Sequence, residues 1–443
     1  MEIKKIKHPQ KSNGLLLLFF SLYMVLPNYF ALEINESFPL MTASRIILLI
    51  CFFIIILKGQ GRISTISLSR IDNKVRYYFL IISLVNILHI FDRGTSSINR
   101  LITIILEQYC VLWLIILIIN TRERFEKAIR VLMYSSAVVA IISIVGFIFD
   151  TNFFYELKTV SRVMTQAGMT DIGYRNGLLR IEAGFGHPVY YGMYCSIMFC
   201  LSLYIYSYRN RKTSSLICML LNVIALLLTN SRGSILAVAI TFVISFFVNG
   251  WKERKKYLRI LFIVTIIALV AFACSTKIRE YVLSVFQSFF VYFGFKESSS
   301  INYGANMSFT SDRLIQFSGI LWTIMRAPLI GFGYGAQSIG AIAFYNIGQW
   351  FKTTTFDVGY VEIFCCYGIL GTIAHMLLLV SIIKNIKFIR RMHYGIMFRN
   401  IFIVYFFCLL SVVTIDKIFW PTFGLLLAYS NIIKLEKTDG RYS

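Results

Sequence analysis

The chain has 443 residues, of which 57% are hydrophobic and only 15% are charged. Soluble domains carry about 25% charged and about 45–50% apolar residues, so an ordinary soluble protein is excluded. Lys and Arg number 44 against 21 Asp and Glu, which gives a net charge of +23. This basic excess has to be located along the chain before it is assigned to any partner.

Apolar runs of about 20 residues, enough to cross a hydrocarbon core of about 30 Å, predict twelve membrane spans. Their limits are 14–32, 40–57, 77–91, 101–119, 131–149, 187–206, 214–229, 233–250, 260–274, 357–383, 400–415 and 418–433. We therefore expect an all-α, polytopic integral membrane protein in which residues 1–443 form a single membrane domain. The first span follows a Lys-rich leader but lacks a small-residue cleavage site, so we expect it to be retained.

Basic residues are concentrated in seven connecting segments, which hold 29 of the Lys and Arg residues and seven of the acids. These segments are 1–13, 58–76, 120–130, 207–213, 251–259, 384–399 and 434–443. They alternate with the other connections, so the positive-inside rule predicts that all seven, and both termini, are cytoplasmic. The basic excess is thus a topology signal and does not indicate nucleic acid.

Two of the remaining connections, 150–186 and 275–356, are too long to be simple turns and are predicted to be extracytoplasmic and functional. Within the second, the apolar spacing of 311–326 predicts a helix lying in the outer interface, because Pro328 limits its length. The stretch 281–295 is also apolar enough to enter the membrane. If 281–295 and 311–326 both crossed the membrane, the chain would have fourteen spans, and the orientation of the other twelve would be unchanged.

Several common chemical signatures are missing from the sequence. It has no phosphate-binding P-loop, no Asp-x-Asp pair and no His-Glu-x-x-His motif. ATP-driven transport, ordinary nucleotide-sugar transfer and zinc proteolysis therefore lack their usual parts. The nine cysteines lie almost wholly in apolar spans and are expected to be buried apolar residues.

The first candidate site lies where the chain re-enters the membrane after the first long loop. Arg180, Glu182 and His187 supply a cation, a carboxylate and an imidazole beside a turn that contains Gly184 and Gly186. This set suits an anionic lipid head group with a nearby acid or base. The alternative is a helix-entry turn in which Arg180 extends toward lipid phosphate.

The second candidate site is the short outer turn 230–233. Arg232 is held between two apolar helices, and a helix begins directly after it. Its guanidinium and the free N–H groups of that helix are expected to converge on a phosphate. Anchoring at the membrane interface is the alternative.

The third candidate site combines Arg313 and Arg326, on the predicted interfacial helix, with Gly331, Gly333 and Gly335 directly after it. Alternating glycines let backbone amides approach a ligand closely, so the run is interpreted as a phosphate-binding element. A flexible turn back into the membrane is the alternative.

The fourth candidate site opens the tenth span. Asp357 is placed at the outer membrane boundary, and Glu362 lies about 7 Å deeper if the segment is helical. A carboxylate in apolar surroundings is costly and is often a general base, or else it is paired with a cation. Glu107, His89 and His375 also lie in spans and are expected to serve packing or helix–helix hydrogen bonds.

Taken together, these motifs resemble the O-antigen ligase and polymerase superfamily over roughly 180–383. The similarity rests on the turn at Arg232, the run from Arg313 through 328–335, and the glycines in 368–371. It implies a membrane glycosyltransferase with a GT-C-like helical fold and a large outer loop between the ninth and tenth helices. Such enzymes use undecaprenyl-diphosphate-linked glycan donors at the outer face of the cytoplasmic membrane, without cofactor or metal.

The resemblance also implies roles for individual residues. Arg232 and Arg313 would hold the diphosphate and stabilise its departure, and Asp357 would deprotonate the acceptor hydroxyl. Ligases of the superfamily place a histidine in the region of Asp357, so this departure favours a polymerase. The other predicted residues are Glu362 and His187 in catalysis and Arg180, Arg326, Gly331, Gly333 and Gly335 in substrate binding.

The predicted function is polymerisation of lipid-linked repeat units into O-antigen, capsular or exopolysaccharide. A ligase that transfers finished glycan to lipid A-core or another acceptor is the nearest alternative, and a lipid-linked oligosaccharide flippase is the alternative from another class. The expected partners are undecaprenyl-diphosphate-linked oligosaccharide and membrane lipid, with a chain-length regulator and a flippase of the same pathway.

Overall fold

The protein is described from a computed structural model. The described residues are 13–34, 40–57, 71–160, 174–175, 178–208, 212–248, 250–251, 313–346, 348–390, 393–413 and 415–438, with single residues between 254 and 283. The helices are α1 (Asn13–Leu22), α2 (Ala43–Leu57), α4 (Asn73–Leu88), α5 (Ile90–Arg93), α6 (Thr95–Thr103), the π-helix η2 (Ile104–Cys110), α7 (Val111–Ile118), α8 (Arg122–Ile148), the 3₁₀ helix η3 (Phe153–Leu157), α11 (Pro188–Tyr208), α12 (Lys212–Leu228), α13 (Arg232–Val248), α16 (Leu314–Gln316), α17 (Ser318–Arg326), the 3₁₀ helix η5 (Ala336–Ile339), α18 (Gly359–Phe388), α19 (His393–Cys408) and α20 (Asp416–Thr438). The short strands pair as antiparallel hairpins: β1 (Ala31–Leu32) with β2 (Met41–Thr42), β3 (Tyr174–Arg175) with β4 (Leu178–Leu179), and β5 (Ala343–Asn346) with β6 (Gln349–Lys352).

The described part of the chain is a helical membrane protein. Five of its helices are long and apolar enough to cross a membrane: Thr95–Ile118, Arg122–Ile148, Pro188–Tyr208, Gly359–Phe388 and Asp416–Thr438. Four shorter apolar helices accompany them: Ala43–Ile55, Thr213–Leu228, Arg232–Val248 and Tyr394–Cys408. The all-α membrane class is therefore confirmed, whereas the count of twelve spans stays a prediction.

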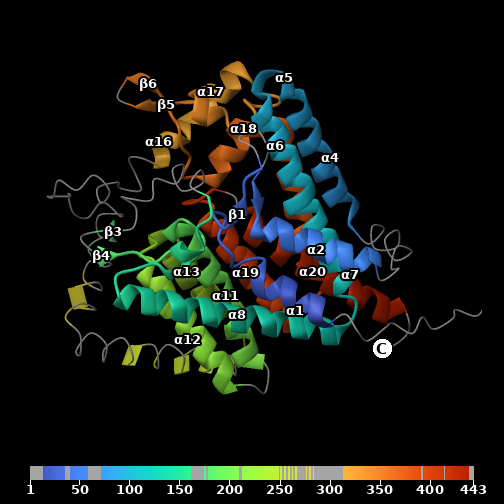
Figure 1. Cartoon of the computed structure of the whole chain (residues 1–443), viewed down its shortest axis with the longest axis vertical. Coiled ribbons are helices and arrows are strands. Elements are labelled where there is room, and N and C mark those ends of the chain that lie inside the picture. Colours follow the sequence, from blue (N-terminus) through green and yellow to red (C-terminus); the bar gives the residue numbers. More distant parts are fainter. Residues whose placement is uncertain are drawn as a thin grey trace, which may run out of the picture.

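The described helices pack against one another in several pairs. α18 lies along α4, α20 packs against α7, and α11 contacts both α12 and α19. Figure 1 shows α4, α5 and α6 along one upper side and α17 with the β5–β6 hairpin on the other, with α18 between them. The long helix α8 crosses the lower part of the same view beside α1, α11 and α12. Large apolar side chains such as Phe53, Leu80 and Phe247 are more than half exposed on the outside, as a lipid-facing surface requires.

Several helix boundaries differ from those predicted. The first helix ends at Leu22, because the chain turns through 23–26 and Pro27 cannot continue a helix. The predicted loop 384–399 is mostly helical, since α18 continues to Phe388 and α19 begins at His393. Lys384 and Lys387 lie on α18, and their long side chains let the charged ends reach outward. Basic residues therefore made the predicted loop longer than the observed one.

Some predicted features lie at the limits of the described chain. The ninth span, 260–274, and the apolar stretch 281–295 lie almost entirely outside the described residues. The predicted interfacial helix 311–326 is helical from Leu314 as α16 and α17, which are separated at Phe317, while 311–312 lie outside the described residues. Its position relative to a membrane stays a prediction.

α18 is interrupted at Gly368, and this break determines how the preceding loop packs. Gly368 has φ +60° and ψ −154°, a conformation that is essentially restricted to glycine. The loop 328–333 supplies the hydrogen bonds that the broken helix loses: its Phe332 and Gly333 amides donate to carbonyls of α18 over 2.9 Å. In return, the amides of Ile369 and Leu370 donate to carbonyls of this loop over 2.9 and 3.0 Å. The loop and the helix therefore satisfy each other's backbone hydrogen bonds around Gly368.

Candidate functional site

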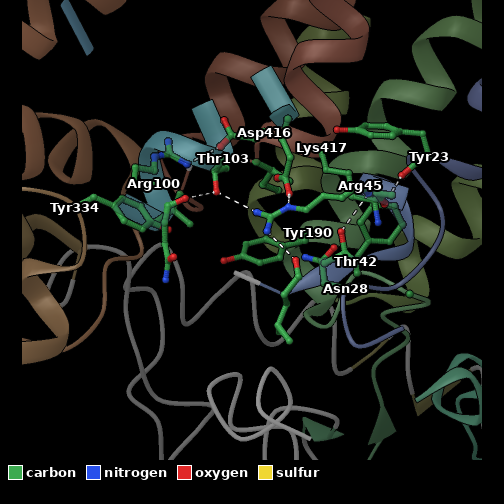
Figure 2. Close-up of a pocket in the computed structure, with 18 of the residues that line it drawn as sticks. Tyr23, Asn28, Thr42, Arg45, Arg100, Thr103, Tyr190, Tyr334, Asp416 and Lys417 are labelled. Atoms are coloured by element: carbon green, nitrogen blue, oxygen red, sulfur yellow. Dashed lines mark hydrogen bonds and ion pairs between the residues drawn. The ribbon is translucent and has the colours of Figure 1, made fainter. Parts of the chain in front are cut away.

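A polar cavity of about 470 Å³ opens where the ends of several helices meet (Figure 2). Three cations and three carboxylates line it: Arg45, Arg100, Lys417, Glu107, Glu362 and Asp416. They come from α2, α6, η2, α18 and α20, at the helix ends that the sequence places on the extracytoplasmic side. With equal numbers of each charge, the cavity is formally neutral.

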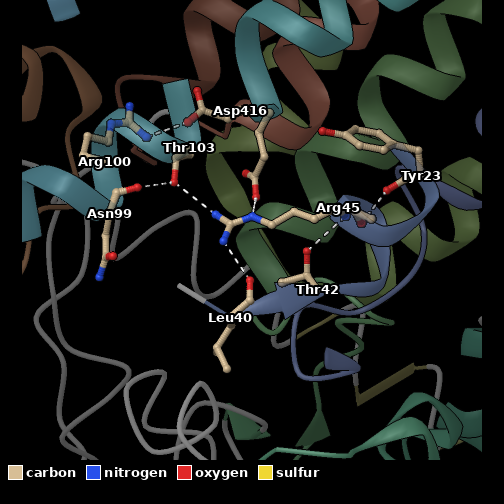
Figure 3. Close-up of polar contacts among 10 residues, drawn as sticks. Tyr23, Leu40, Thr42, Arg45, Asn99, Arg100, Thr103 and Asp416 are labelled. Atoms are coloured by element: carbon tan, nitrogen blue, oxygen red, sulfur yellow. Dashed lines mark hydrogen bonds and ion pairs between the residues drawn. The ribbon is translucent and has the colours of Figure 1, made fainter. Parts of the chain in front are cut away.

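Arg45 joins the start of α2 to the helix that contains η2. Its Nε donates to Oε1 of Glu107 over 2.6 Å, and its Nη atoms donate to the carbonyl of Leu40 over 2.7 Å and to Oγ1 of Thr103 over 3.1 Å (Figure 3). Arg45 is only 8% exposed. Glu107 thus forms a bond between helices, as expected from the sequence.

The π-helical segment η2 directs neighbouring side chains to two different partners. Glu107 reaches Arg45, while the next residue, Gln108, donates from Nε2 to Oδ1 of Asp416 over 2.9 Å. Single π-helical turns inside α-helices are frequent at functional sites. The π-helical segment η2 thus connects the Arg45–Glu107 ion pair with the Arg100–Asp416 ion pair.

Asp416, the first residue of α20, accepts hydrogen bonds from three side chains. Arg100 donates from Nη1 over 2.7 Å, Gln108 over 2.9 Å and the indole of Trp420 over 3.1 Å. A carboxylate at a helix N-terminus is also stabilised by the helix dipole. The Asp416 carboxylate is therefore held in one position by three donors.

Arg100 is clamped on its other sides by two tyrosines. Its Nε donates to the hydroxyl of Tyr367 over 3.0 Å, and its guanidinium lies 4.6 Å from the centre of the Tyr334 ring. Within the described part of the chain these contacts use Nε and one Nη atom, so the second Nη atom is available to a ligand.

Lys417 follows Asp416 and closes another side of the cavity. Its Nζ donates to the carbonyl of Leu26 and lies 6.0 Å from the ring of Phe185. The ammonium group thus ties the start of α20 to the chain after α1.

A second cavity of about 550 Å³ adjoins the first and is mainly apolar. It lies along α18, α19 and α20, and it shares Arg100, Glu362 and Asp416 with the polar cavity. The three shared residues therefore mark a junction between a polar and an apolar space.

Glu362 has a position that none of the other four predicted catalytic residues has. It lies in the first turn of α18 and lines both cavities, whereas Asp357, Arg232, Arg313 and His187 line neither. Asp357 is exposed, and its Oδ2 accepts a hydrogen bond from the side chain of Gln316 over 3.1 Å. Gln316 in turn accepts from the amides of Asp357 and Val358 over 3.0 and 3.2 Å, which stabilises the start of α18.

Two pairs of predicted residues are brought near each other. Arg180 donates from Nε to the carbonyl of Thr229 over 2.9 Å, three residues before Arg232, and both arginines are buried. Arg313 lies one helical turn before Gln316, the partner of Asp357.

The segment that follows α19 contacts the neighbours of Arg232 and Asp357. A side chain at Gly233 would overlap Ser411, and a Cβ at Gly359 would lie 2.8 Å from the carbonyl of Val412. Gly233, which follows Arg232, and Gly359, two residues after Asp357, thus pack against one short segment, whose continuation lines the polar cavity at Val413.

The predicted glycines pack closely against other parts of the protein. A Cβ at Gly331 would lie 2.7 Å from the carbonyl of Cys365, and one at Gly333 would lie 2.9 Å from the His89 ring. The amides of Gly331 and Gly333 donate to backbone carbonyls. Gly335, with φ +80°, is less crowded. These contacts explain the glycines by packing, so we do not assign the phosphate to them.

Two further predicted residues have structural partners. Nδ1 of His187 accepts from the amide of Val189 over 3.1 Å, which caps the start of α11. The guanidinium of Arg326 is exposed and lies 3.2 Å from the centre of the Trp322 ring. His187 thus acts as a helix cap and Arg326 makes a cation–π contact, and both are common structural roles of these residue types.

Glu182 lies in a separate buried network. It accepts a hydrogen bond from the hydroxyl of Tyr155, and Nδ2 of Asn152 is 3.5 Å from its Oε1. Burial raises the pKa of the Glu182 carboxyl above its ordinary value, although these hydrogen bonds and Arg180 oppose the shift.

Sequence reasoning missed four of the six charged residues of the cavity: Arg45, Arg100, Asp416 and Lys417. A signal was present for Arg45, because a charged residue inside a predicted span is usually functional or paired. Asp416 and Lys417 formed the entire two-residue connection between the last two predicted spans. Their pairing with distant helices has no local signature.

The fold and the site together define a polytopic helical membrane protein with a buried ionic cavity beside an apolar one. The sequence model of the O-antigen ligase family matches residues 216–376, which confirms the resemblance to the O-antigen ligase and polymerase superfamily over that segment. No curated protein matches the chain. The matched segment contains Glu362, Arg232 and Arg313, whereas Arg45 and Asp416 lie outside it.

Proposed function

We propose that this protein is a membrane glycosyltransferase that polymerises undecaprenyl-diphosphate-linked repeat units into O-antigen, capsular or exopolysaccharide. The family match supports an enzyme of the O-antigen ligase or polymerase type. The position of the site is inferred from one observation. Arg100, Glu362 and Asp416 line both the polar and the apolar cavity, so they mark the junction between the two. A lipid-linked glycan has an apolar and a polar part joined by a diphosphate, and this junction matches that division.

The reaction follows from the substrate. A hydroxyl oxygen of the acceptor sugar forms a bond to the anomeric carbon of the donor, while the bond from that carbon to the diphosphate oxygen breaks. The diphosphate leaves with the electron pair, and the hydroxyl proton passes to a base. Inversion at the anomeric carbon is expected for one displacement.

Cations must offset the charge of the leaving diphosphate. We assign this role to the second Nη atom of Arg100, which lines the junction. The resemblance adds Arg232 and Arg313, and these two arginines line neither of the two cavities. Each charge-assisted hydrogen bond of this kind contributes roughly 1.5–3 kcal/mol. The remaining cavity is neutral and rich in hydroxyl, amide and aromatic side chains, which suits a sugar.

Glu362 is our proposed base, in preference to Asp357. Proton abstraction requires the carboxylate to lie within hydrogen-bond reach of the hydroxyl that attacks. Glu362 lines the cavity in which we place the sugars, whereas Asp357 is exposed and bonded to Gln316. Arg180, Gly335 and His187 stay candidates for contacts with the rest of the substrate.

The proposed location is the inner membrane, with both termini cytoplasmic and the site on the outer face. The proposed partners are a flippase that delivers the lipid-linked units and a chain-length regulator. A ligase is the second candidate, because the family match is to an O-antigen ligase model.

Reconstitution tests the proposal. Purified protein in vesicles that contain only lipid-linked repeat units is expected to produce a ladder of longer lipid-linked chains. Transfer only after lipid A-core is added would establish the ligase instead. Units that cross the bilayer unchanged would establish a flippase.

A further inference from the structure

The charges of the polar cavity are unevenly distributed, although they sum to zero. One cation and two carboxylates lie at its junction with the apolar cavity: Arg100, Glu362 and Asp416. Two cations and one carboxylate line the polar cavity alone: Arg45, Lys417 and Glu107. This second set, which we call the Lys417 side, therefore has one more cation than carboxylates.

Lys417 is the source of this positive excess. Arg45 and Glu107 neutralise each other, because Nε of Arg45 lies 2.6 Å from Oε1 of Glu107. Nζ of Lys417 instead donates to the carbonyl of Leu26, which is an uncharged acceptor. Glu107 also attracts the ammonium, but Arg45 already holds that carboxylate. Among the described residues, Lys417 forms no ion pair with a carboxylate of its own.

The position of Lys417 in its helix makes this charge more costly. Lys417 is the second residue of α20, and the N-terminal end of a helix has a partial positive charge that opposes a cation. A partly buried ammonium that lacks an anionic partner is also poorly solvated. An anionic ligand in the cavity would reduce both costs, since the ammonium and the helix end would both attract it.

The surroundings of Lys417 suit a sugar. Small hydroxyl and amide side chains line the polar cavity and not the apolar one: Asn28, Thr42, Ser44, Asn99 and Thr103. Tyr23, Phe185 and Tyr190 add aromatic rings to the same wall. Polar groups and rings in this combination are typical of sites for small ligands.

Lys417 is also separated from the arginine to which we assign the diphosphate. Figure 2 shows Lys417 with Arg45 and Tyr23 on one side of the cavity, and Arg100 with Tyr334 on the other. Lys417 lines only the polar cavity, whereas Arg100 lines both. A diphosphate bound at Arg100 thus leaves the Lys417 ammonium to a different anion.

We propose that Lys417 binds the carboxylate of an acidic sugar, such as a hexuronic acid, in the repeat unit. This proposal rests on the function proposed above and names its substrate class. An ammonium group has three hydrogens, and the described contacts of Lys417 use one of them, at Leu26. The other two are available to the sugar carboxylate, while the nearby hydroxyl and amide side chains bind the ring hydroxyls.

Binding of two small sugars tests the site without the reaction. Methyl glucuronide and methyl glucoside differ only at C6, which is a carboxylate in the first and a hydroxymethyl group in the second. We expect purified protein to bind the glucuronide at least about tenfold more tightly, measured by isothermal titration calorimetry at low salt. Equal affinities, or tighter binding of the glucoside, would overturn the proposal.

A variant tests whether Lys417 is responsible. Lys417→Gln removes the charge and keeps a donor for the Leu26 carbonyl, so it should abolish the difference between the two sugars. Lys437→Gln is the matched control, because Lys437 is exposed near the other end of the same helix, and it should keep that difference. The comparison of the two sugars in wild type decides the question even if Lys417→Gln does not fold.

Two results with Lys417→Gln would overturn the assignment. One is an unchanged preference for the glucuronide. The other is weaker binding of undecaprenyl diphosphate with that preference intact, since Lys417 would then serve the diphosphate.

The polymer provides an independent test and separates the two proposals. We expect an acidic sugar in every repeat unit of the polysaccharide that the protein makes, measured by sugar analysis. A polymer of uncharged sugars alone would overturn the role of Lys417 while leaving the polymerase intact. Preferential glucuronide binding by a protein that extends no chain would support the sugar site and reject the proposed reaction.

Discussion

Arg100 donates a hydrogen bond from Nη1 to Oδ2 of Asp416 over 2.7 Å, although 316 positions separate the two residues. This pair links α6 to α20 and lies at the junction of both cavities. Removing one partner of a buried ion pair leaves the other charge without compensation, at a cost of about 3–5 kcal/mol. Asp416→Asn is therefore expected to lower the free energy of unfolding by this amount, measured by thermal unfolding in detergent.

A second ion pair offers a matched control for this experiment. Arg122 and Glu436 lie 2.7 Å apart, but the Arg122 side chain is 39% exposed. Exposed pairs contribute about 0–1 kcal/mol, so Glu436→Gln should change stability little. Equal losses in the two variants would show that the Arg100–Asp416 pair has no special energetic role.

Arg232 is proposed to bind the donor diphosphate through its planar guanidinium. Arg232→Lys keeps the charge but loses the bidentate geometry, so we expect initial rates of chain extension to fall by about 10- to 100-fold. Arg254→Lys, in a predicted cytoplasmic segment, is the control. Wild-type polymer length and yield in Arg232→Lys would remove the residue from the diphosphate site.

Gly368 is expected to be indispensable for the packing of the loop 328–333 on α18. In Gly368→Ala, the new Cβ would lie 2.6 Å from the Gly331 amide nitrogen, at a positive φ that disfavours side chains. We expect a loss of at least about 1–3 kcal/mol, seen as a lower melting temperature. Gly14→Ala, where nothing beyond the local helix backbone lies within 4 Å of the new methyl group, should leave the melting temperature nearly unchanged.

The raised pKa of Glu182 predicts how stability depends on pH. The folded protein retains the Glu182 proton over a pH range in which the unfolded chain has already lost it. The free energy of unfolding therefore decreases as the pH rises from the ordinary glutamate value of 4.5 through the raised one. Glu182→Gln should remove this part of the pH dependence, whereas the same substitution at the exposed neighbour Glu156 should not. Parallel pH profiles for wild type and Glu182→Gln would contradict the prediction.

Hydrophobicity predicted the membrane class because apolar runs report directly on the environment of a helix. Charged residues were harder to interpret. Glu362 was identified because it is a lone carboxylate in an apolar segment, but the same pattern also selected Asp357, which the fold places at an exposed helix start. The partner of Arg100 could not be predicted, since no local pattern connects α6 with α20.

The glycine run illustrates a related difficulty. Gly331, Gly333 and Gly335 all have positive φ angles, which glycine adopts without strain but which were not predicted from the sequence. Their packing against α18 could not be predicted either, because it depends on the break at Gly368 in a different segment. The sequence indicates a phosphate-binding element or a flexible turn, and it does not predict the packing of these glycines against α18.

The account depends most on Glu362 as the base at the junction of the cavities. The decisive measurement is the rate of chain extension by purified Glu362→Gln at saturating lipid-linked repeat unit, compared with Asp357→Asn. We predict a loss of about 10²- to 10⁴-fold for Glu362→Gln with donor binding retained, and a far smaller loss for Asp357→Asn. A Glu362→Gln enzyme as fast as wild type, or a larger loss in Asp357→Asn, would contradict the account.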